Sequence, residues 1–261
     1  MVGSGDLNRC EGDYCRKWID DGYIVAEHLV GDDYLEYVWN ADERSIGEGS
    51  IVPPQEPAYE GDTVPGRVLN PHFSVGAIEE LMQLPEITRL IELPLCANTI
   101  AFQSISGHKA SQQAVHSDSI HMTTYPQGYL VAIWIAFEDI DPHSGPLTYY
   151  PGSHRLPYLF AKDVGIPVED DRSPNYGNFD ALYTPEIECL ANESGIRPAY
   201  FHAKRGDVLF WHANLIHGGS PRHDAMLTRK AFVFHYFAEG CLCYHDLSGG
   251  PSWLGDRTLN S

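Results

Sequence analysis

A histidine and an aspartate two positions apart are the first residues in this chain whose types and spacing point to chemistry. Residues 115–118 read Val-His-Ser-Asp, and residues i and i+2 of a strand point to the same face, so His116 and Asp118 can reach one metal ion. Such a pair, completed by a histidine from far along the chain, is the facial triad of non-heme Fe(II) oxygenases, which leaves coordination positions open. The chain contains 13 histidines, so the tripeptide also arises by chance and requires a matching third ligand.

Two histidines compete for the role of third ligand, His212 and His217. Their odd separation places them on opposite faces of a regular strand over residues 207–216. His217 stands at the end of this expected strand, before Gly218 and Gly219, where the backbone can approach a ligand closely. We therefore predict that His116, Asp118 and His217 bind the metal, and that His212 is a core or surface residue.

Arg229 could bind a carboxylate beside this metal. It opens an expected strand at residues 229–237, and antiparallel pairing across the loop 218–228 would bring it next to His217. A guanidinium group binds a carboxylate through two parallel hydrogen bonds. Taken alone, Arg229 is better explained as a surface residue at the start of a strand; together with the triad, we interpret it as a carboxylate clamp.

Two other classes of protein could use the same ligands. A zinc-dependent hydrolase is one alternative, because ligand type alone does not fix the metal. A catalytically inactive jelly-roll protein with a binding or regulatory role is the other. Arg229 and the open coordination face favour an iron enzyme, and a degenerate binder would have no need of all four residues.

Composition restricts the partners. The chain has 36 acidic and 17 basic side chains, a formal net charge of -19, and a field of this sign disfavours nucleic acids and anionic membranes. We find no secretory leader and no apolar run long enough for a membrane span, and the six cysteines match no zinc pattern. We therefore expect a cytoplasmic protein, a monomer or homodimer, that acts on a small molecule.

The elements that must position these residues change in character along the chain. Helical spacing is present in residues 13–30 and 74–93, a turn leads into a short strand at residues 22–25, and residues 42–67 resemble an irregular loop. From residue 98 onward the pattern is typical of strands and turns. The expected strands cover residues 99–106, 129–137, 147–150, 207–216 and 229–237.

We interpret residues 1–261 as a single domain, mainly β with flanking helices. Its helical N-terminal support covers about 13–97 and its β core about 98–240. We predict that the acidic, Pro/Gly-punctuated residues 162–198 form a lid loop with one short helix after Thr184. Alternation along residues 129–137 places Leu130, Ala132, Trp134 and Ala136 on one face; this face either lines a concavity with an aromatic wall or packs as core.

With these motifs in place, the chain resembles the phytanoyl-CoA dioxygenase family, which includes ectoine hydroxylase. The similarity extends over roughly residues 13–237. The motifs are 21–25 (Asp-Gly-Tyr-Ile-Val), 115–118, 134–140 (Trp-Ile-Ala-Phe-Glu-Asp-Ile), 144–154 (Ser-Gly-Pro-Leu-Thr-Tyr-Tyr-Pro-Gly-Ser-His), 206–207 (Gly-Asp), 217–218 (His-Gly) and 229–231 (Arg-Lys-Ala). The resemblance implies a double-stranded β-helix (a cupin-like jelly roll) with the metal at its open end.

The resemblance also implies the cofactors Fe(II), 2-oxoglutarate and O2, with ascorbate as a reductant in assays. It implies that 2-oxoglutarate chelates the iron, that its far carboxylate meets Arg229, and that Gln103, Trp134 and Ser220 contact it. The family often has serine two residues after the distal histidine, where this chain has Gly219. A one-residue insertion in the loop would explain why Ser220 and Arg229 each come one position later.

The resemblance leaves the substrate open. Related halogenases replace the carboxylate ligand with a small residue, so Asp118 indicates a hydroxylation or another oxidation, with release of succinate and CO2. Residues in motifs that face the cavity in relatives are substrate candidates, although ordinary packing is an alternative for each of them: His121, Tyr125, Tyr149 and His154. No Lys/Arg cluster suggests a coenzyme A phosphate site, so a CoA thioester is not favoured.

Overall fold

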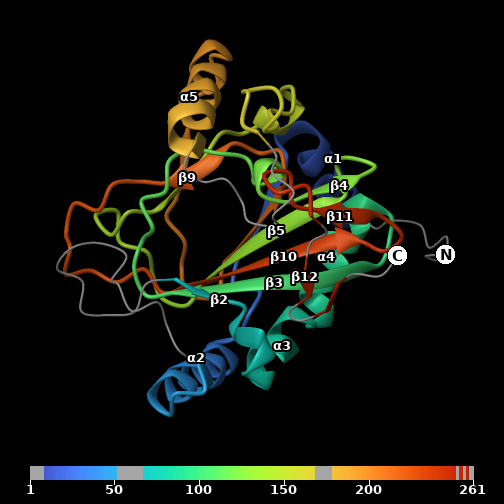
Figure 1. The fold of residues 1–261 in the computed structure, drawn as a ribbon. Coiled ribbons are helices and arrows are strands. Elements are labelled where there is room, and N and C mark those ends of the chain that lie inside the picture. The colour runs from blue at the N-terminus through green and yellow to red at the C-terminus, as the bar shows by residue number, and fades with distance from the viewer. Residues whose placement is uncertain (1–8, 52–66, 168–177, 251–252, 255–256, 259–261) are drawn as a thin grey trace.

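A computed structural model describes residues 9–51, 67–167, 178–250, 253–254 and 257–258 of the 261-residue chain. Most of its helices precede the central strands in the sequence (Figure 1). The helices are α1 (Arg9–Asp21), α2 (Asp32–Gly47), α3 (Gly76–Met82), α4 (Pro85–Leu95) and α5 (Thr184–Glu193). Single turns are 3-10 helices η1 (Pro71–Phe73), η2 (Asp118–Ile120) and η3 (Ser153–Arg155) and the π-helix η5 (Phe179–Tyr183).

The strands form one large antiparallel sheet and three small ones. The large sheet has the order β1-β8-β5-β10-β3-β2. Its members are β1 (Tyr23–Ala26), β2 (Val68–Leu69), β3 (Thr99–Gly107), β5 (Leu130–Ala136), β8 (Val208–His212) and β10 (Ala231–Ala238). The small sheets are β7-β6-β9 (Ala199–Phe201, Leu147–Tyr149, His217–Gly219), β11-β4 (Leu242–Tyr244, Thr123–Tyr125) and β12-β13 (Trp253–Leu254, Arg257–Thr258).

Strand β5 shows how the large sheet separates two cores. All seven of its residues are buried, and successive side chains of a strand point to opposite faces. Ile133 and its alternates pack with the helices, whereas Trp134 and its alternates pack with β6 and β7 of the small sheet. The division of residues 129–137 into two faces was therefore predicted correctly for these two cores.

Helices α1–α4 cover the first of these faces. Leu35, Ile78 and Ile91 are fully buried in the same cluster as the β-branched residues of β5. Figure 1 shows α2 and α3 on one side of the central strands, with β9 and α5 on the other. The second face of the large sheet is thus left for a cavity between it and the small sheet β7-β6-β9. No helix in the described part of the chain is long and apolar enough to cross a membrane.

Several predicted elements differ from the observed ones. The loop expected at residues 42–67 is wrong at its start, because α2 continues to Gly47; residues 52–66 lie outside the described part. The strand expected at 207–216 ends at His212. Within residues 13–97, β1 confirms the short strand expected at residues 22–25, whereas β2 was not predicted; these two are the edge strands of the large sheet. Within residues 162–198, α5 matches the expected helix, and residues 168–177 lie outside the described part.

Helix α2 escaped prediction because a carboxylate occupies its inner face. Leu35, Val38, Trp39 and Asp42 have the spacing of one helix face, and all four are buried. Burial raises the pKa of the Asp42 carboxyl to about 6, against opposing contributions from Ser106 and His108. The folded state therefore holds this proton up to a higher pH than the unfolded chain does.

Asp42→Asn is expected to stabilise the protein at pH 7.5. The folded pKa of about 6 lies above the ordinary 3.8, so stability falls as pH rises through this window, and the ionised carboxyl costs about 3 kcal/mol above it, at about 1.4 kcal/mol per pKa unit. We expect the unfolding free energy to rise by about 1–2 kcal/mol. The gain is smaller than the cost of the ionised carboxyl because the buried amide also loses its hydration. Urea denaturation at pH 7.5 and 4.5 measures it.

The gain should shrink at pH 4.5, where Asp42 is protonated in the folded protein. Glu36→Gln is the control, because Glu36 is an exposed carboxylate on the same helix. A loss of stability at pH 7.5 in Asp42→Asn would contradict the assigned cost of burial.

Candidate active site

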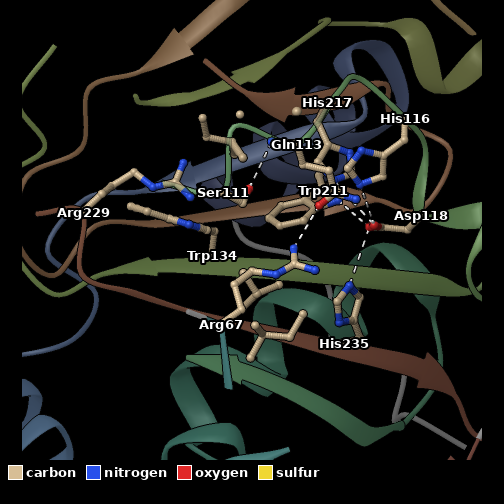
Figure 2. Close-up of a pocket in the computed structure, with 15 residues that line it drawn as sticks. Arg67, Ser111, Gln113, His116, Asp118, Trp134, Trp211, His217, Arg229 and His235 are labelled. Carbon is tan, nitrogen blue, oxygen red and sulfur yellow. Dashed lines mark hydrogen bonds and ion pairs between the residues drawn. The ribbon is translucent and has the colours of Figure 1, made fainter. Parts of the chain in front are cut away.

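His116, Asp118 and His217 come together at one point of the cavity, as predicted. One ligand atom from each lies within 4.8 Å of the others, and all three residues are buried. The Nε2 atoms of His116 and His217 are 3.9 and 3.5 Å from Asp118 Oδ1. Figure 2 shows the three side chains pointing toward one another. Two imidazoles and one carboxylate with this convergence fit an iron ion with open coordination positions.

Backbone carbonyls orient both imidazoles for metal binding. The Nδ1 atom of His116 is 2.8 Å from the Ala114 carbonyl, and that of His217 is 2.9 Å from the Leu215 carbonyl. An Nδ1–H donated to a carbonyl leaves Nε2 as the free acceptor. Burial, reinforced by His217, lowers the pKa of His116 to about 3. At neutral pH His116 is therefore neutral, which is the form that binds a metal.

Asp118 is held in its ionised form. Burial opposes ionisation, but the interactions with His217 and His235 overcome it and keep the pKa of Asp118 well below its ordinary value. The indole Nε1 of Trp211 donates a hydrogen bond to Oδ2 at 2.7 Å. The other oxygen, Oδ1, faces the two histidines. The carboxylate thus presents one oxygen to the metal position and one to the protein.

Trp211 and His235 are site residues that the sequence did not reveal to us. His235 Nε2 lies 3.8 Å from Asp118 Oδ2, and its Nδ1 has no hydrogen-bond partner among the described residues. Trp211 adjoins His212, and His235 is the one imidazole among the aliphatic and aromatic side chains of strand β10. A polar residue inside an apolar strand was the available signal for His235.

Glycines bring the two metal-binding segments together. His116 and His217 form an isolated antiparallel bridge, with backbone hydrogen bonds of 2.8 and 2.9 Å between them. A Cβ on Gly219 would lie 2.9 Å from the Gln112 nitrogen, and one on Gly218 3.0 Å from the Gln113 carbonyl. We predicted that these glycines let the backbone approach a ligand; in the structure they let it approach the backbone of Gln112 and Gln113.

His212 is excluded for a different reason from the one predicted. It ends β8, and the chain then turns, with Leu215 N–H bonded to its carbonyl at 2.7 Å and Asn214 N–H bonded to its Nδ1 at 3.0 Å. His217 begins β9 in another sheet. His212 packs against the rings of Trp18 and His154, which agrees with the core role expected for it.

Arg229 lies in the same cavity as the triad, stacked on Trp134. Its guanidinium carbon is 5.7 Å from the Trp134 ring centroid, and Nη1 donates to the Gly145 carbonyl at 3.0 Å. The route that we predicted for it is wrong: β9 and β10 belong to different sheets, and Arg229 precedes β10. Residues of both sheets line the cavity, and Figure 2 shows Arg229 at one side of it and the three metal ligands at the other.

Gln103 and Ser220 occupy different positions from Arg229 and Trp134. Gln103 is paired in register with His235, and its buried Oε1 has no hydrogen-bond partner in the described part of the chain. This oxygen is a candidate for contact with a bound molecule. Ser220 Oγ lies 2.5 Å from Thr148 Oγ1. Neither residue is among those that line the cavity.

The four residues predicted to contact substrate are not brought together. The His121 ring stacks on Phe179 at 5.2 Å and meets the His116 ring edge-on at 5.4 Å. Tyr125 is 69% exposed on β4. Tyr149 packs on Tyr23, and His154 Nε2 contacts the Ile19 carbonyl in α1 at 3.1 Å. Of these, His121 lies beside a metal ligand, and the other three pack elsewhere.

The cavity between the sheets joins the metal position to Arg229. The space between its walls is about 550 Å³, a figure that includes open solvent. Ile105, Val233 and Leu147 contribute apolar wall. Three polar residues that the sequence analysis missed also line it: Arg67, Ser111 and Gln113. The pairing of β2 with β3 brings Arg67 to the cavity, and the spacing of residues along the sequence does not reveal this pairing.

The phytanoyl-CoA dioxygenase family model matches residues 59–231. The chain belongs to this family. Peroxisomal phytanoyl-CoA dioxygenase of Bos taurus is 26% identical over 252 residues, covering 90% of this chain and 70% of that protein. Its Homo sapiens counterpart is 26% identical over 173 residues, and this match spans 64% of the chain and 47% of that protein.

Solved structures share the fold of this family member. The epimerase SnoN in complex with Fe3+, alpha ketoglutarate and nogalamycin RO has a TM-score of 0.67 and 18% identity, covering 95% of this chain and 97% of that one. EctD from S. alaskensis with 2-oxoglutarate and 5-hydroxyectoine has a TM-score of 0.70 and 18% identity, covering 100% and 88%. Family membership and the triad together support iron and 2-oxoglutarate as the cofactors.

Trp211→Phe is expected to weaken Fe(II) binding by roughly 10- to 100-fold, because partners that orient a metal ligand have effects of this size. The substitution keeps an aromatic ring but removes the indole donor from Asp118 Oδ2. Anaerobic competition with a chromophoric chelator measures the affinity. Trp39→Phe is the control, since Trp39 lies on α2 and is buried in the core between the helices and the large sheet. Equal affinity in Trp211→Phe and wild type would contradict the role of the indole.

Proposed function

We propose that this protein is an Fe(II)- and 2-oxoglutarate-dependent dioxygenase that hydroxylates, or otherwise oxidises, a small molecule. One observation carries the proposal: the three metal ligands and a buried arginine line the same cavity. A metal site alone suits many reactions, whereas a guanidinium group at the far end suits a co-substrate that has an anionic group at each end. The two-sheet arrangement and the likeness to oxygenases support a jelly roll for the core.

Each group in the cavity has a role in this reaction. His116, Asp118 and His217 would hold Fe(II), and Arg229 would bind the far carboxylate of 2-oxoglutarate. When bound, the iron and its co-substrate supply the oxidation: 2-oxoglutarate and O2 give succinate and CO2, and the second oxygen atom enters the product of hydroxylation. Trp134 and Trp211, both buried, contribute aromatic walls to this space.

Asp118 supports hydroxylation over halogenation. Its carboxylate points one oxygen to the metal position and is fixed by Trp211. A halide would need this coordination position, so the intact ligand favours oxygen transfer. His121 and Gln103 remain proposed contacts for substrate and co-substrate, and Ser220, Tyr125, Tyr149 and His154 remain predictions.

Succinate formation tests the proposal. Protein purified without oxygen is mixed with Fe(II), 2-oxoglutarate, ascorbate and air, with and without pools of small molecules, and succinate is quantified. We expect Fe(II)-dependent succinate, stimulated by the pool that contains the substrate, and a product heavier by one oxygen atom. Succinate that is absent with Fe(II) in every pool, or unchanged in His116→Ala, would contradict the proposal.

The zinc hydrolase alternative predicts a different outcome from the same protein. A Zn(II)-loaded sample should then convert ester or amide pools without O2, and Fe(II) should give no succinate. An inactive binding protein would give neither product. We favour the oxygenase because Arg229 is buried in the cavity, where neither alternative needs it.

A further inference from the structure

A second arginine, Arg67, enters the cavity from the edge of the large sheet. It directly precedes β2, which pairs with β3 through Val68–Ser106 and Leu69–Ile105. Val68 is buried, and Asn70 N–H bonds to the Ser104 carbonyl at 2.7 Å. These contacts fix the backbone beside Arg67, which is itself exposed and lines the cavity.

The side chain of Arg67 is directed toward the interior of the site. Nη1 donates to Gln113 Oε1 at 2.9 Å, and Gln113 also lines the cavity, close in sequence to His116. Figure 2 shows the guanidinium group between Arg229 and His235, with Trp211 close by in that view.

Resting on the proposed function, the far carboxylate of 2-oxoglutarate is bound by Arg229, and Arg67 is a second arginine that lines the same cavity. A guanidinium group suits a carboxylate through two parallel hydrogen bonds, which favours an anionic group at Arg67. In a protein with a formal net charge of -19, a second cation in the site is a specific local feature, because nearby charges outweigh distant ones.

We propose that Arg67, oriented by Gln113, binds a carboxylate of the substrate and thereby places the substrate beside the metal. The planar guanidinium group has five N–H donors in a fixed fork, a geometry that suits a carboxylate, and Gln113 orients it. Ile105 and Val233, which pair across β3 and β10, line the cavity as well and provide an apolar surface for the rest of the molecule. The substrate class is therefore a small carboxylic acid with an apolar body.

A matched pair of probes tests this assignment. Phenylacetate and phenylacetamide have the same shape and differ in charge. Each is titrated anaerobically into protein loaded with Fe(II) and 2-oxoglutarate, and binding is followed by saturation-transfer NMR. We expect wild type to prefer phenylacetate by roughly 10- to 100-fold, the size of one hydrogen-bonded charge pair. Arg67→Gln should remove the preference, and Arg67→Lys should retain part of it.

The controls separate this site from the co-substrate site. Arg205→Gln removes an exposed arginine that pairs with Asp32 and should keep the preference. The dissociation constant of 2-oxoglutarate should change by less than about threefold in Arg67→Gln. No preference in wild type, or a preference that survives in Arg67→Gln, would overturn the proposal. A large loss of 2-oxoglutarate binding in Arg67→Gln would also overturn it, because Arg67 would then serve the co-substrate.

The proposed function can fail separately. The Fe(II) and 2-oxoglutarate complex forms or does not form before any probe is added. A complex that forms and shows no carboxylate preference would refute the role of Arg67 alone, whereas absence of the complex would refute the oxygenase.

Discussion

Asp118→Ala is expected to abolish turnover, with a fall in succinate formation of at least about 1,000-fold. The substitution removes the only carboxylate among the three ligands. A bound metal ion contributes several kcal/mol to catalysis, and each 1.4 kcal/mol corresponds to about tenfold in rate. It also leaves the Trp211 indole N–H without its acceptor. Succinate release at saturating 2-oxoglutarate, together with Fe(II) affinity, measures the effect.

Two variants make this result specific. Asp118→Glu keeps the charge but moves it by one methylene, so it should retain some Fe(II) binding and lose most activity. Asp33→Ala removes an exposed aspartate from α2 and should match wild type. Circular dichroism confirms that each variant is folded. Activity of Asp118→Ala within tenfold of wild type would contradict its place as a metal ligand.

Arg229→Ala is expected to raise the dissociation constant of 2-oxoglutarate by roughly 30- to 4,000-fold. Arg229 is 8% exposed, and truncating one member of a buried, hydrogen-bonded charge pair costs about 2–5 kcal/mol. The rate at saturating co-substrate should fall far less, since the metal ligands are intact. Initial rates of succinate release over a range of 2-oxoglutarate concentrations separate the two parameters.

Neighbouring residues supply the comparisons for Arg229. Arg229→Lys keeps the charge but loses the fork, so its dissociation constant should lie between those of wild type and Arg229→Ala. Lys230→Ala is the matched control, because the Lys230 ammonium group lies over the Trp39 ring at 5.0 Å, away from the cavity. An unchanged dissociation constant of 2-oxoglutarate in Arg229→Ala would show that Arg229 does not bind the co-substrate.

The metal ligands could be predicted from the sequence because their geometry is local. His116 and Asp118 flank one extended residue, Ser117, with φ -106° and ψ 147°, so their side chains point the same way without a long strand. His217 was also predicted, but the argument assumed a continuous strand through His212 where the chain turns. Gly218 and Gly219 pointed to His217 because they allow a close approach of the neighbouring backbone, which is also a local feature.

The rest of the site depends on strand register, which spacing along the chain does not fix. Register places His235 opposite Ala132 on β5 and Gln103 on β3. It also places Leu69 of β2 opposite Ile105, which brings Arg67 to the cavity. A shift by one residue would turn these side chains to the helical face. For the same reason Arg229 was predicted to lie near the metal through a strand pairing that does not exist.

Binding of 2-oxoglutarate to the iron form of the protein tests the central claim most directly. Protein loaded with Fe(II) without oxygen is titrated with 2-oxoglutarate while its visible absorption is recorded, and oxygen is then admitted and succinate measured. The account predicts a charge-transfer band that saturates at about one co-substrate per chain, as expected for a single site, and that decays with oxygen as succinate forms. A protein that binds Fe(II) but shows neither the band nor succinate would contradict it.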